Sequence, residues 1–504
     1  MNSRTGHALA LLGGAAALGL TGEALRVWSP ARLDFTLWCA AVLVAVVALI
    51  RGGALTPPPR AAWLAGAVAL VLSCMIWRDS PTLFAFNIVA IIGLLVLATP
   101  ATAMQSLGRL GVSDLFRGGL WLGASVASGP IPAAVADVRW AELPLTARTR
   151  RLTAVAAGLL AALPVLFLFG SLLSEADPLF GQTMANILAF DLEKLAQHLF
   201  LTGVFAWAAA GLLRGGFWRE GWLPPATFEF DPRVPPATVL TFLGAIGVLF
   251  ALFIGFQARE LFLGPGEFQA LTGTTIAEYA RAGFFELVAV TTLTLPLLLA
   301  ADWLLSRHEA TEIRQLRRLT VAVIVLLALL LASAYNRMLL YRSYYGLTED
   351  RFYTLAFMTW LGVVLAWFAA TVLRGQRARF MPGAVLAALV ALLTLNVINP
   401  DAFIARVNLG RALEGASLDK EYLGRLSADA VPAIVDGAMQ LEVTERCALL
   451  RQMETRWSAE LERSGPTSTW NLARRKAQGS VGPAWAAARS CAPPVEGQGT
   501  DAKL

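Results

Sequence analysis

Charged residues, histidines and nucleotide-binding motifs are all scarce in this sequence. Only 15% of its 504 residues are charged, whereas a soluble domain carries roughly 25%. The three histidines (His7, His198 and His308) are scattered along the chain, which argues against a histidine metal site. The sequence also has no P-loop, glycine-rich dinucleotide fingerprint or nucleophile elbow. We therefore expect no metal site, no cofactor and no ATP-driven chemistry from this chain alone.

Long apolar runs stand where the charged residues are missing. Hydrophobic residues make up 57% of the chain, and a helix needs about 20 mostly apolar residues to cross ~30 Å of hydrocarbon. Eleven runs are candidates, at residues 7–22, 33–50, 61–77, 82–100, 153–173, 197–213, 237–257, 283–304, 319–339, 352–373 and 382–398. The first is the weakest. It could be a signal peptide, but no clear cleavage site follows it, so we favour a retained helix. The sequence predicts an all-α polytopic transmembrane helix bundle of about 11 spans.

The composition changes after Asn399. Residues 400–504 contain 13 basic and 13 acidic residues, which is polar enough for a water-soluble region. Helical periodicity predicts a small helical C-terminal domain over 400–483 and a tail over 484–504. The transmembrane bundle then occupies 1–399. Its loop at 101–151 is half apolar with glycine and proline breaks, so we expect a cytoplasmic interfacial segment there rather than another span.

Basic loops indicate the orientation, because Lys and Arg are enriched on the cytoplasmic side. Three basic segments fall on the same side when the spans alternate, namely "LTARTRRL" (145–152), "SRHEATEIRQLRRL" (306–319) and "RGQRARF" (374–380). We expect a bacterial inner-membrane protein with a cytoplasmic N-terminus and an extracytoplasmic C-terminal domain. The net charge of +6 lies entirely in the membrane part, so it is a topology signal. Membrane lipids are the expected partners, and nucleic acid is not.

The four cysteines divide between the two regions. Cys39 and Cys74 lie in apolar runs, whereas Cys447 and Cys491 lie in the C-terminal domain. An oxidising environment outside the membrane would allow a Cys447–Cys491 disulfide. Two free buried thiols are the alternative, and the sequence leaves both open.

The stretch "YRSYYGLTEDRFYT" (341–354) raises a question of function, because it concentrates polar residues between two apolar runs. Gly346 is a natural helix C-terminus, and Thr348 can cap a following helix that begins with two acids. The stretch therefore predicts a tight extracytoplasmic hairpin. Since tyrosine rings favour the membrane interface, a purely structural turn would account for most of these residues.

Arg337 fits that structural reading less well, because it lies deeper in the preceding run, where an arginine needs a partner or a wet cavity. It shares one helix face with Tyr341 and Tyr345 at a spacing of four residues. Acidic and basic residues of other outer segments could converge on the same place. The candidate ligand site is Asp177, Glu278, Arg281, Glu286, Arg337, Tyr341, Arg342 and Tyr345. A salt-bridge network that ties the spans together is the alternative.

Four segments resemble a known family: "SEADPLF", "EYARAGFFEL", "RMLLYRSYYGLTEDRFY" and "NPDAFIARVNL…LDKEYLGRLSADAVPAI". They are similar to bacterial polytopic membrane proteins catalogued as a domain of unknown function (numbers four-one-five-three and four-one-seven-three), over roughly residues 150–440. The resemblance implies an integral membrane protein with a soluble C-terminal segment, and it supplies no reaction and no catalytic residue. The matching positions are Glu278, Tyr279, Arg281, Arg337, Tyr341, Gly346, Thr348 and Arg351.

Three kinds of function are compatible with these features. The first is binding or transport of an anionic or lipid ligand, with arginines holding the anion and acids gating or coupling. The second is a lipid-linked envelope glycosyltransferase-like enzyme, for which Glu23, Asp34 or Asp177 could be the general base. The third is a scaffold or regulatory protein that binds an envelope partner through the C-terminal domain. We favour the first, without catalysis.

Overall fold

The computed structural model is helical, and the all-α prediction is confirmed. The structure describes residues 3–25, 32–56, 61–99, 111–140, 192–217, 234–262, 284–305, 310–462 and 470–491, together with residues 155, 169 and 173. Eight helices in these ranges are long and apolar enough to cross a membrane. They are α2 (Arg32–Arg51), α4 (Pro81–Ala98), α9 (Leu192–Phe217), α10 (Pro236–Phe262), α13 (Phe284–Leu305), α14 (Ala310–Tyr345), α15 (Glu349–Thr371) and α16 (Phe380–Ile398).

Two further apolar runs form the helices α1 (Ser3–Ala24) and α3 (Ala61–Trp77). Ten of the eleven predicted runs therefore coincide with helices. The remaining one, 153–173, lies outside the described ranges apart from isolated residues. These apolar helices make the chain a multi-pass membrane protein.

The chain divides into two compact units, and the first comprises residues 1–69, 94–104 and 115–223. Here α1 packs along α9 and α2, and the core includes Leu11, Leu18 and Leu213. The segment predicted as an interfacial loop contains α6 (Val112–Ser128) and the short π-helix η2 (Ala133–Asp137). Asp137, at the end of η2, is buried between Arg4 and Arg214, at 2.6 and 3.1 Å.

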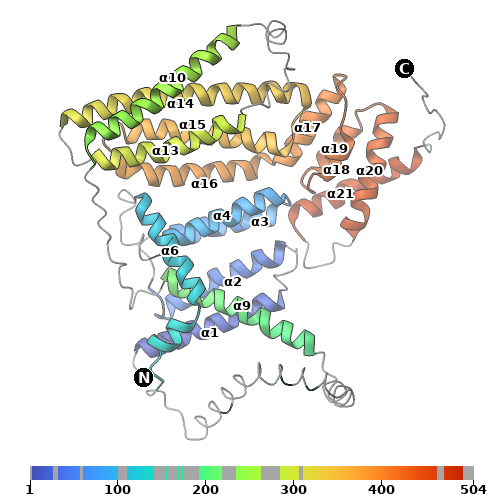
Figure 1. The fold of residues 1–504 in the computed structure, drawn as a ribbon. Coiled ribbons are helices and arrows are strands. Elements are labelled where there is room, and N and C mark those ends of the chain that lie inside the picture. Colours follow the sequence, from blue (N-terminus) through green and yellow to red (C-terminus); the bar gives the residue numbers. More distant parts are fainter. Residues whose placement is uncertain are drawn as a thin grey trace. The chain divides into compact units, whose positions relative to one another are not determined.

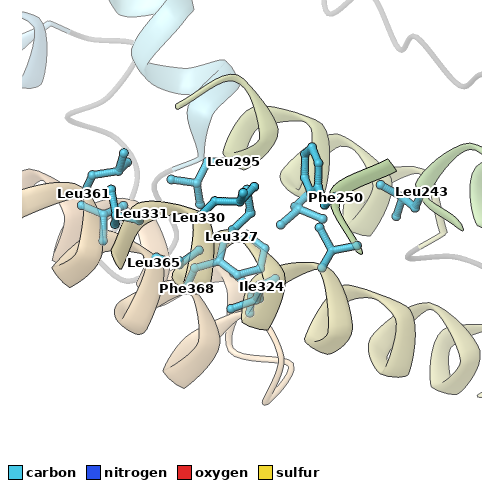
Figure 2. Close-up of a cluster of buried hydrophobic side chains, with 14 of the residues drawn as sticks. Leu243, Phe250, Leu295, Ile324, Leu327, Leu330, Leu331, Leu361, Leu365 and Phe368 are labelled. Carbon is cyan, nitrogen blue, oxygen red and sulfur yellow. The ribbon is translucent and has the colours of Figure 1, made fainter. Parts of the chain in front are cut away.

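The second unit comprises residues 70–93, 105–114 and 224–504. In it α13, α14, α15 and α16 lie side by side, and α10 packs on α14 (Figure 1). The core of this bundle is aliphatic and aromatic, with Phe250, Leu295, Leu327 and Phe368 among its members (Figure 2). The bundle also exposes many large apolar side chains, which suits helices whose solvent is lipid.

One buried polar pair joins two helices inside this second unit. Asn87 of α4 and Asn396 of α16 exchange side-chain hydrogen bonds at 3.4 and 3.2 Å. Both side chains are buried. A polar pair in an apolar setting favours one register of the two helices, because sliding would break both bonds between the side chains.

The C-terminal helices gather at one end of the α13–α16 layer (Figure 1). They are α17 (Pro400–Leu413), α18 (Lys420–Arg425), α19 (Val431–Ala438), α20 (Val443–Glu462) and α21 (Leu472–Ser490). Their own core includes Leu423, Ile434 and Met453. The sequence placed a tail from Ala484, but α21 continues to Ser490 with Ala484 buried.

A disulfide joins the last two helices of this region. Cys447 of α20 and Cys491, which directly follows α21, are bonded, with 5.9 Å between their Cα atoms. The other two cysteines, Cys39 and Cys74, are free. The sequence allowed either this disulfide or two free thiols, and the structure contains the disulfide.

Candidate functional site

The residues of the site predicted from the sequence fall into three groups. Asp177, Glu278 and Arg281 lie outside the described residues. Glu286 is exposed in the first turn of α13. The other four residues, Arg337, Tyr341, Arg342 and Tyr345, follow one another along the last turns of α14 and are half-buried or exposed.

The two tyrosines of this set do face each other, but a different arginine accompanies them. The ring centroids of Tyr341 and Tyr345 are 5.1 Å apart. The guanidinium of Arg351, from the following helix, lies 4.2 Å from the centre of the Tyr341 ring. It also donates hydrogen bonds to the carbonyl oxygens of Tyr345 and Gly346, at 3.0 and 2.7 Å. Arg351 therefore supports the turn as a cation–π partner and a C-cap.

The turn is also bound to α17. Gly346 has a φ of 76°, in the left-handed region that favours glycine. Asn408 accepts from the backbone nitrogen of Leu347 and donates to its carbonyl oxygen, at 2.8 and 2.7 Å. Arg411 donates to the carbonyl oxygens of Ser343 and Tyr344. These contacts give the conspicuous turn a structural role, because they satisfy backbone groups at the end of α14.

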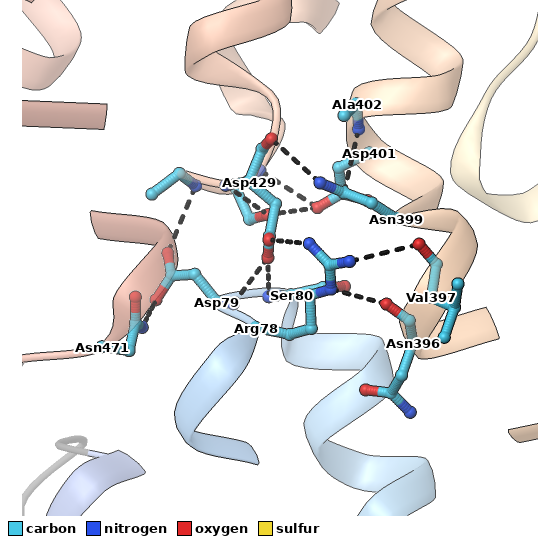
Figure 3. A network of polar contacts seen from close by, with 12 residues as sticks. Arg78, Asp79, Ser80, Asn396, Val397, Asn399, Asp401, Ala402, Asp429 and Asn471 are labelled. Carbon is cyan, nitrogen blue, oxygen red and sulfur yellow. Dashed lines mark hydrogen bonds and ion pairs between the residues drawn. The ribbon is translucent and has the colours of Figure 1, made fainter. Parts of the chain in front are cut away.

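A dense polar cluster lies elsewhere, around the short connection between α3 and α4 (Figure 3). The Asp429 carboxylate accepts hydrogen bonds from the backbone nitrogens of Asp79 and Ser80, where α4 begins. In return, the Asp79 carboxylate accepts from the backbone nitrogen of Ala428 at 3.2 Å. The two hydrogen bonds to Asp429 place its negative charge at the N-terminus of α4, where unpaired N–H groups favour an anion.

Arg78 connects this cluster to the end of α16. Its Nη1 donates to Asp429 Oδ1 at 3.2 Å. Its Nε and Nη2 donate to the carbonyl oxygens of Asn396 and Val397, at 2.6 and 3.3 Å. These carbonyls belong to the last turn of α16, where no further helical N–H group is available to bond them. The negative end of the helix dipole at this position also favours a cation. Arg78 is only 9% exposed, and its guanidinium lies 4.0 Å from the centre of the Trp77 ring.

Asn399 turns the chain from α16 into α17. It takes a left-handed conformation, with a φ of 59°, which ends α16. Its side-chain oxygen then accepts from the backbone nitrogen of Ala402 at 3.2 Å and caps α17, whose first residue is Pro400. Proline at the first helical position and Asn at the cap are both favoured there. This sharp corner brings Asp401 into the cluster.

Asp401 is fully buried. Its Oδ2 accepts hydrogen bonds from the backbone and hydroxyl of Ser427, while its Oδ1 has no partner among the described residues. Burial raises the pKa of Asp401 to about 6, although the bonds from Ser427 lower it in part. Burial likewise raises the pKa of Asp429 to about 6, against the lowering effects of its bonds from the 79–80 backbone and of the Arg78 charge. The cluster thus holds carboxyl groups that can protonate near neutral pH.

The far side of Asp79 is held by α21. Its Oδ1 accepts from Asn471 Nδ2 at 2.7 Å and from Arg474 Nε at 2.9 Å. Arg474 also pairs with Glu460 at 3.1 Å. Burial by itself lowers the pKa of Arg474, but the hydrogen bonds and charges of Asp79 and Glu460 outweigh it, so the net shift is upward.

A pocket of 420 Å³ opens beside this cluster. Its walls come from the end of α3, from one face of α17, from α19 and from α21. Three cationic side chains line it: Arg78, Arg406 and Lys476. Two acids also line it, Asp429, which is bound to Arg78, and Asp436.

This arrangement is suited to binding an anion and is poorly suited to a metal. No group of three or more metal-ligating side chains occurs in the described part of the chain. The pocket volume falls within the usual ~300–1,000 Å³ of small-molecule sites. The Arg78 guanidinium has five N–H donors, and three of them are used in the bonds above.

Reasoning from the sequence missed most of this site. Arg78 and Asp79 directly follow an apolar run in "MIWRDSP". This adjacent cation and anion at the end of a predicted span could have indicated a polar site. Asp429 lies in the short polar segment "SAD" (427–429), about 350 residues further along the chain. Nothing local in either segment indicates that the two would meet.

A comparison with known protein families gives a match. A family model described as a domain of unknown function (DUF4153) matches residues 65–437. This range begins earlier than the sequence resemblance and includes the α3–α4 connection as well as Asp429. No curated protein and no solved structure matches the chain.

Proposed function

The chain belongs to the DUF4153 family, and we propose that this integral membrane protein binds an anionic ligand in the 420 Å³ pocket. A phosphate group is the best-fitting chemistry. The observation that carries the proposal is the convergence of Arg78, Arg406 and Lys476 from three separate elements on one pocket. Arginine presents a planar fork that suits phosphate oxygens, and lysine adds a point charge.

The charges of the pocket support this assignment. Three cationic side chains face two acidic ones, so the lining carries one net positive charge. Arg406 and Lys476 have exposed side chains and form no ion pair with any residue that the structure describes. Their charges are therefore available to a ligand. Arg78 contributes its two remaining N–H donors from a fixed position, because its other donors hold α16 and Asp429.

This pocket takes the place of the Arg–Tyr–Glu cavity expected from the sequence. The aromatic face of α14 lies against Arg351 of α15 and ends in a turn bound to α17, which is a structural arrangement. The described residues add no observation in favour of a glycosyltransferase-like enzyme or of a scaffold that binds an envelope partner. Binding, with or without transport, is the function that we retain.

The location of the protein is part of the same proposal. Basic loops after the fourth, eighth and tenth predicted spans support a cytoplasmic N-terminus and an extracytoplasmic C-terminal domain in a bacterial inner membrane. The Cys447–Cys491 disulfide is consistent with an oxidising compartment. In this orientation the pocket faces the outside of the inner membrane.

A matched pair of neighbouring substitutions tests the site. Lys476 lines the pocket, whereas Arg475, the preceding residue of α21, does not and is exposed. The full chain, purified in detergent, is titrated calorimetrically with glycerol 3-phosphate. We expect Lys476→Ala to weaken binding about tenfold, since a hydrogen bond to a charged group contributes roughly 1.5–3 kcal/mol. Arg475→Ala should change it less than twofold. No binding by the unmodified protein, or equal effects of the two substitutions, would contradict the proposal.

A further inference from the structure

We propose that the phosphate belongs to an acidic membrane lipid, whose headgroup enters the pocket while its acyl chains remain in the adjoining leaflet. This inference rests on the proposed anion site and names the source of the anion. Three features of the pocket support it: its position at the ends of two helices, its apolar edge and the pattern along α17.

The first feature is the level of the pocket along the membrane helices. Trp77 is the last residue of the apolar helix α3, and Asn399 directly follows α16. Both line the pocket. The end of a spanning helix marks the border between hydrocarbon and water, where lipid phosphates lie and where tryptophan is enriched. A ligand in this pocket is therefore at headgroup level.

The second feature is the apolar edge. Leu413 lines the pocket and its side chain is 49% exposed. Leu413 lies outside the spanning helices, so surrounding hydrocarbon does not explain its exposure. A small soluble oxyanion needs no such edge, whereas the glycerol backbone and upper acyl carbons of a lipid do.

The third feature is the arrangement along α17. Ala402, Arg406, Leu409 and Leu413 are spaced by four, three and four residues and share one helix face. The same face thus carries a cation and, further along, the exposed apolar side chain of Leu413. A ligand that carries a phosphate next to a hydrophobic chain could contact the cation with its phosphate and the apolar side chain with its hydrophobic part.

The test compares a lipid with its own soluble headgroup fragment. The full chain in detergent is titrated with phosphatidylglycerol, phosphatidylcholine and glycerol 3-phosphate, and bound lipid is counted by native mass spectrometry. We expect phosphatidylglycerol to bind at least tenfold more tightly than glycerol 3-phosphate, and more tightly than phosphatidylcholine, whose choline cation meets a cationic pocket. Lys476→Ala should weaken phosphatidylglycerol binding about tenfold.

A second variant separates the two proposals. Leu413→Ser changes only the apolar edge, at a half-exposed position where folding is not at risk. It should weaken phosphatidylglycerol severalfold and leave glycerol 3-phosphate unchanged. If glycerol 3-phosphate binds as tightly as the lipid and Leu413→Ser affects neither, the lipid inference is overturned while the anion site stands. If neither compound binds, both proposals fail. If the lipid binds but Lys476→Ala has no effect, the lipid lies elsewhere and this assignment is wrong.

Discussion

Replacing Asp401 with asparagine should make the C-terminal region more stable at neutral pH. The side chain is fully buried, and its Oδ1 has no partner among the described residues. Its pKa is about 6, against an ordinary value of 3.8. At 1.36 kcal/mol per pKa unit, holding this carboxylate ionised costs about 3 kcal/mol. Asparagine keeps an oxygen acceptor for Ser427 and removes the charge.

The sign of the pH dependence follows from the same shift. Because burial raises the pKa of Asp401 in the folded protein, the folded state binds more protons than the unfolded state between about pH 4 and pH 6. Stability should therefore increase as the pH falls through 6 towards 4, and the full cost should be present above pH 6. Asp429, whose pKa is also raised, contributes in the same direction and remains in the variant.

Hydrogen exchange of the full-length protein measures this locally. Peptides from α17 and α19 are followed at pH 5.5 and 7.5, after correction for intrinsic exchange rates. Asp401→Asn should raise the opening free energy at pH 7.5 by up to about 3 kcal/mol and at least halve its pH dependence. Asp436→Asn, at an exposed carboxyl of the same region, is the control and should change it little. A variant that is less stable than the unmodified protein at pH 7.5 would refute the reasoning.

Three further changes should have measurable effects. Asp436→Asn removes an acid from the pocket and should tighten glycerol 3-phosphate binding about two- to fivefold in calorimetry; weaker binding would contradict the charge argument. Reduction of Cys447–Cys491, which are 44 residues apart, should lower the stability of α20 and α21 by roughly 4 kcal/mol in hydrogen exchange, and unchanged protection would show that the bond constrains little. Gly346→Ala forces a left-handed residue and a Cβ at 2.5 Å from Arg411 Nη1, so the melting temperature should fall by the equivalent of about 1–3 kcal/mol; an unaltered melting temperature would argue against a tight turn.

The membrane helices could be predicted because hydrophobic length is a local property. Ten apolar runs coincide with helices, since twenty consecutive apolar residues have few alternatives in lipid. The end of the C-terminal domain was harder. The expected domain ends at residue 483, and proline is unfavourable inside a helix, yet α21 includes Pro483 and buries Ala484 and Ala488. Packing against the C-terminal core overrides that local signal.

The polar site could not be predicted in the same way. The helical spacing of Tyr341 and Tyr345 correctly indicates that the rings share a face, but the cation above them, Arg351, comes from the next helix across the turn. The bond from Arg78 to Asp429 spans 351 residues of sequence. Neither segment contains a pattern that specifies its distant partner. From the sequence alone, each carboxylate and guanidinium is equally compatible with a solvated position at the membrane surface.

That separation has a consequence for how the protein is made. At about 5–20 residues per second, a ribosome needs roughly 20–70 s to travel from Arg78 to Asp429, the 351 residues that separate the two. During that time the backbone nitrogens of Asp79 and Ser80, just before α4, lack Asp429 as their acceptor, and Asn87 lacks Asn396 for almost as long. The last helices to be synthesised therefore complete some of the first, so assembly of the second unit is a late event in biogenesis. A nascent chain stalled anywhere between these segments would present the same unfinished end to the membrane quality-control proteases.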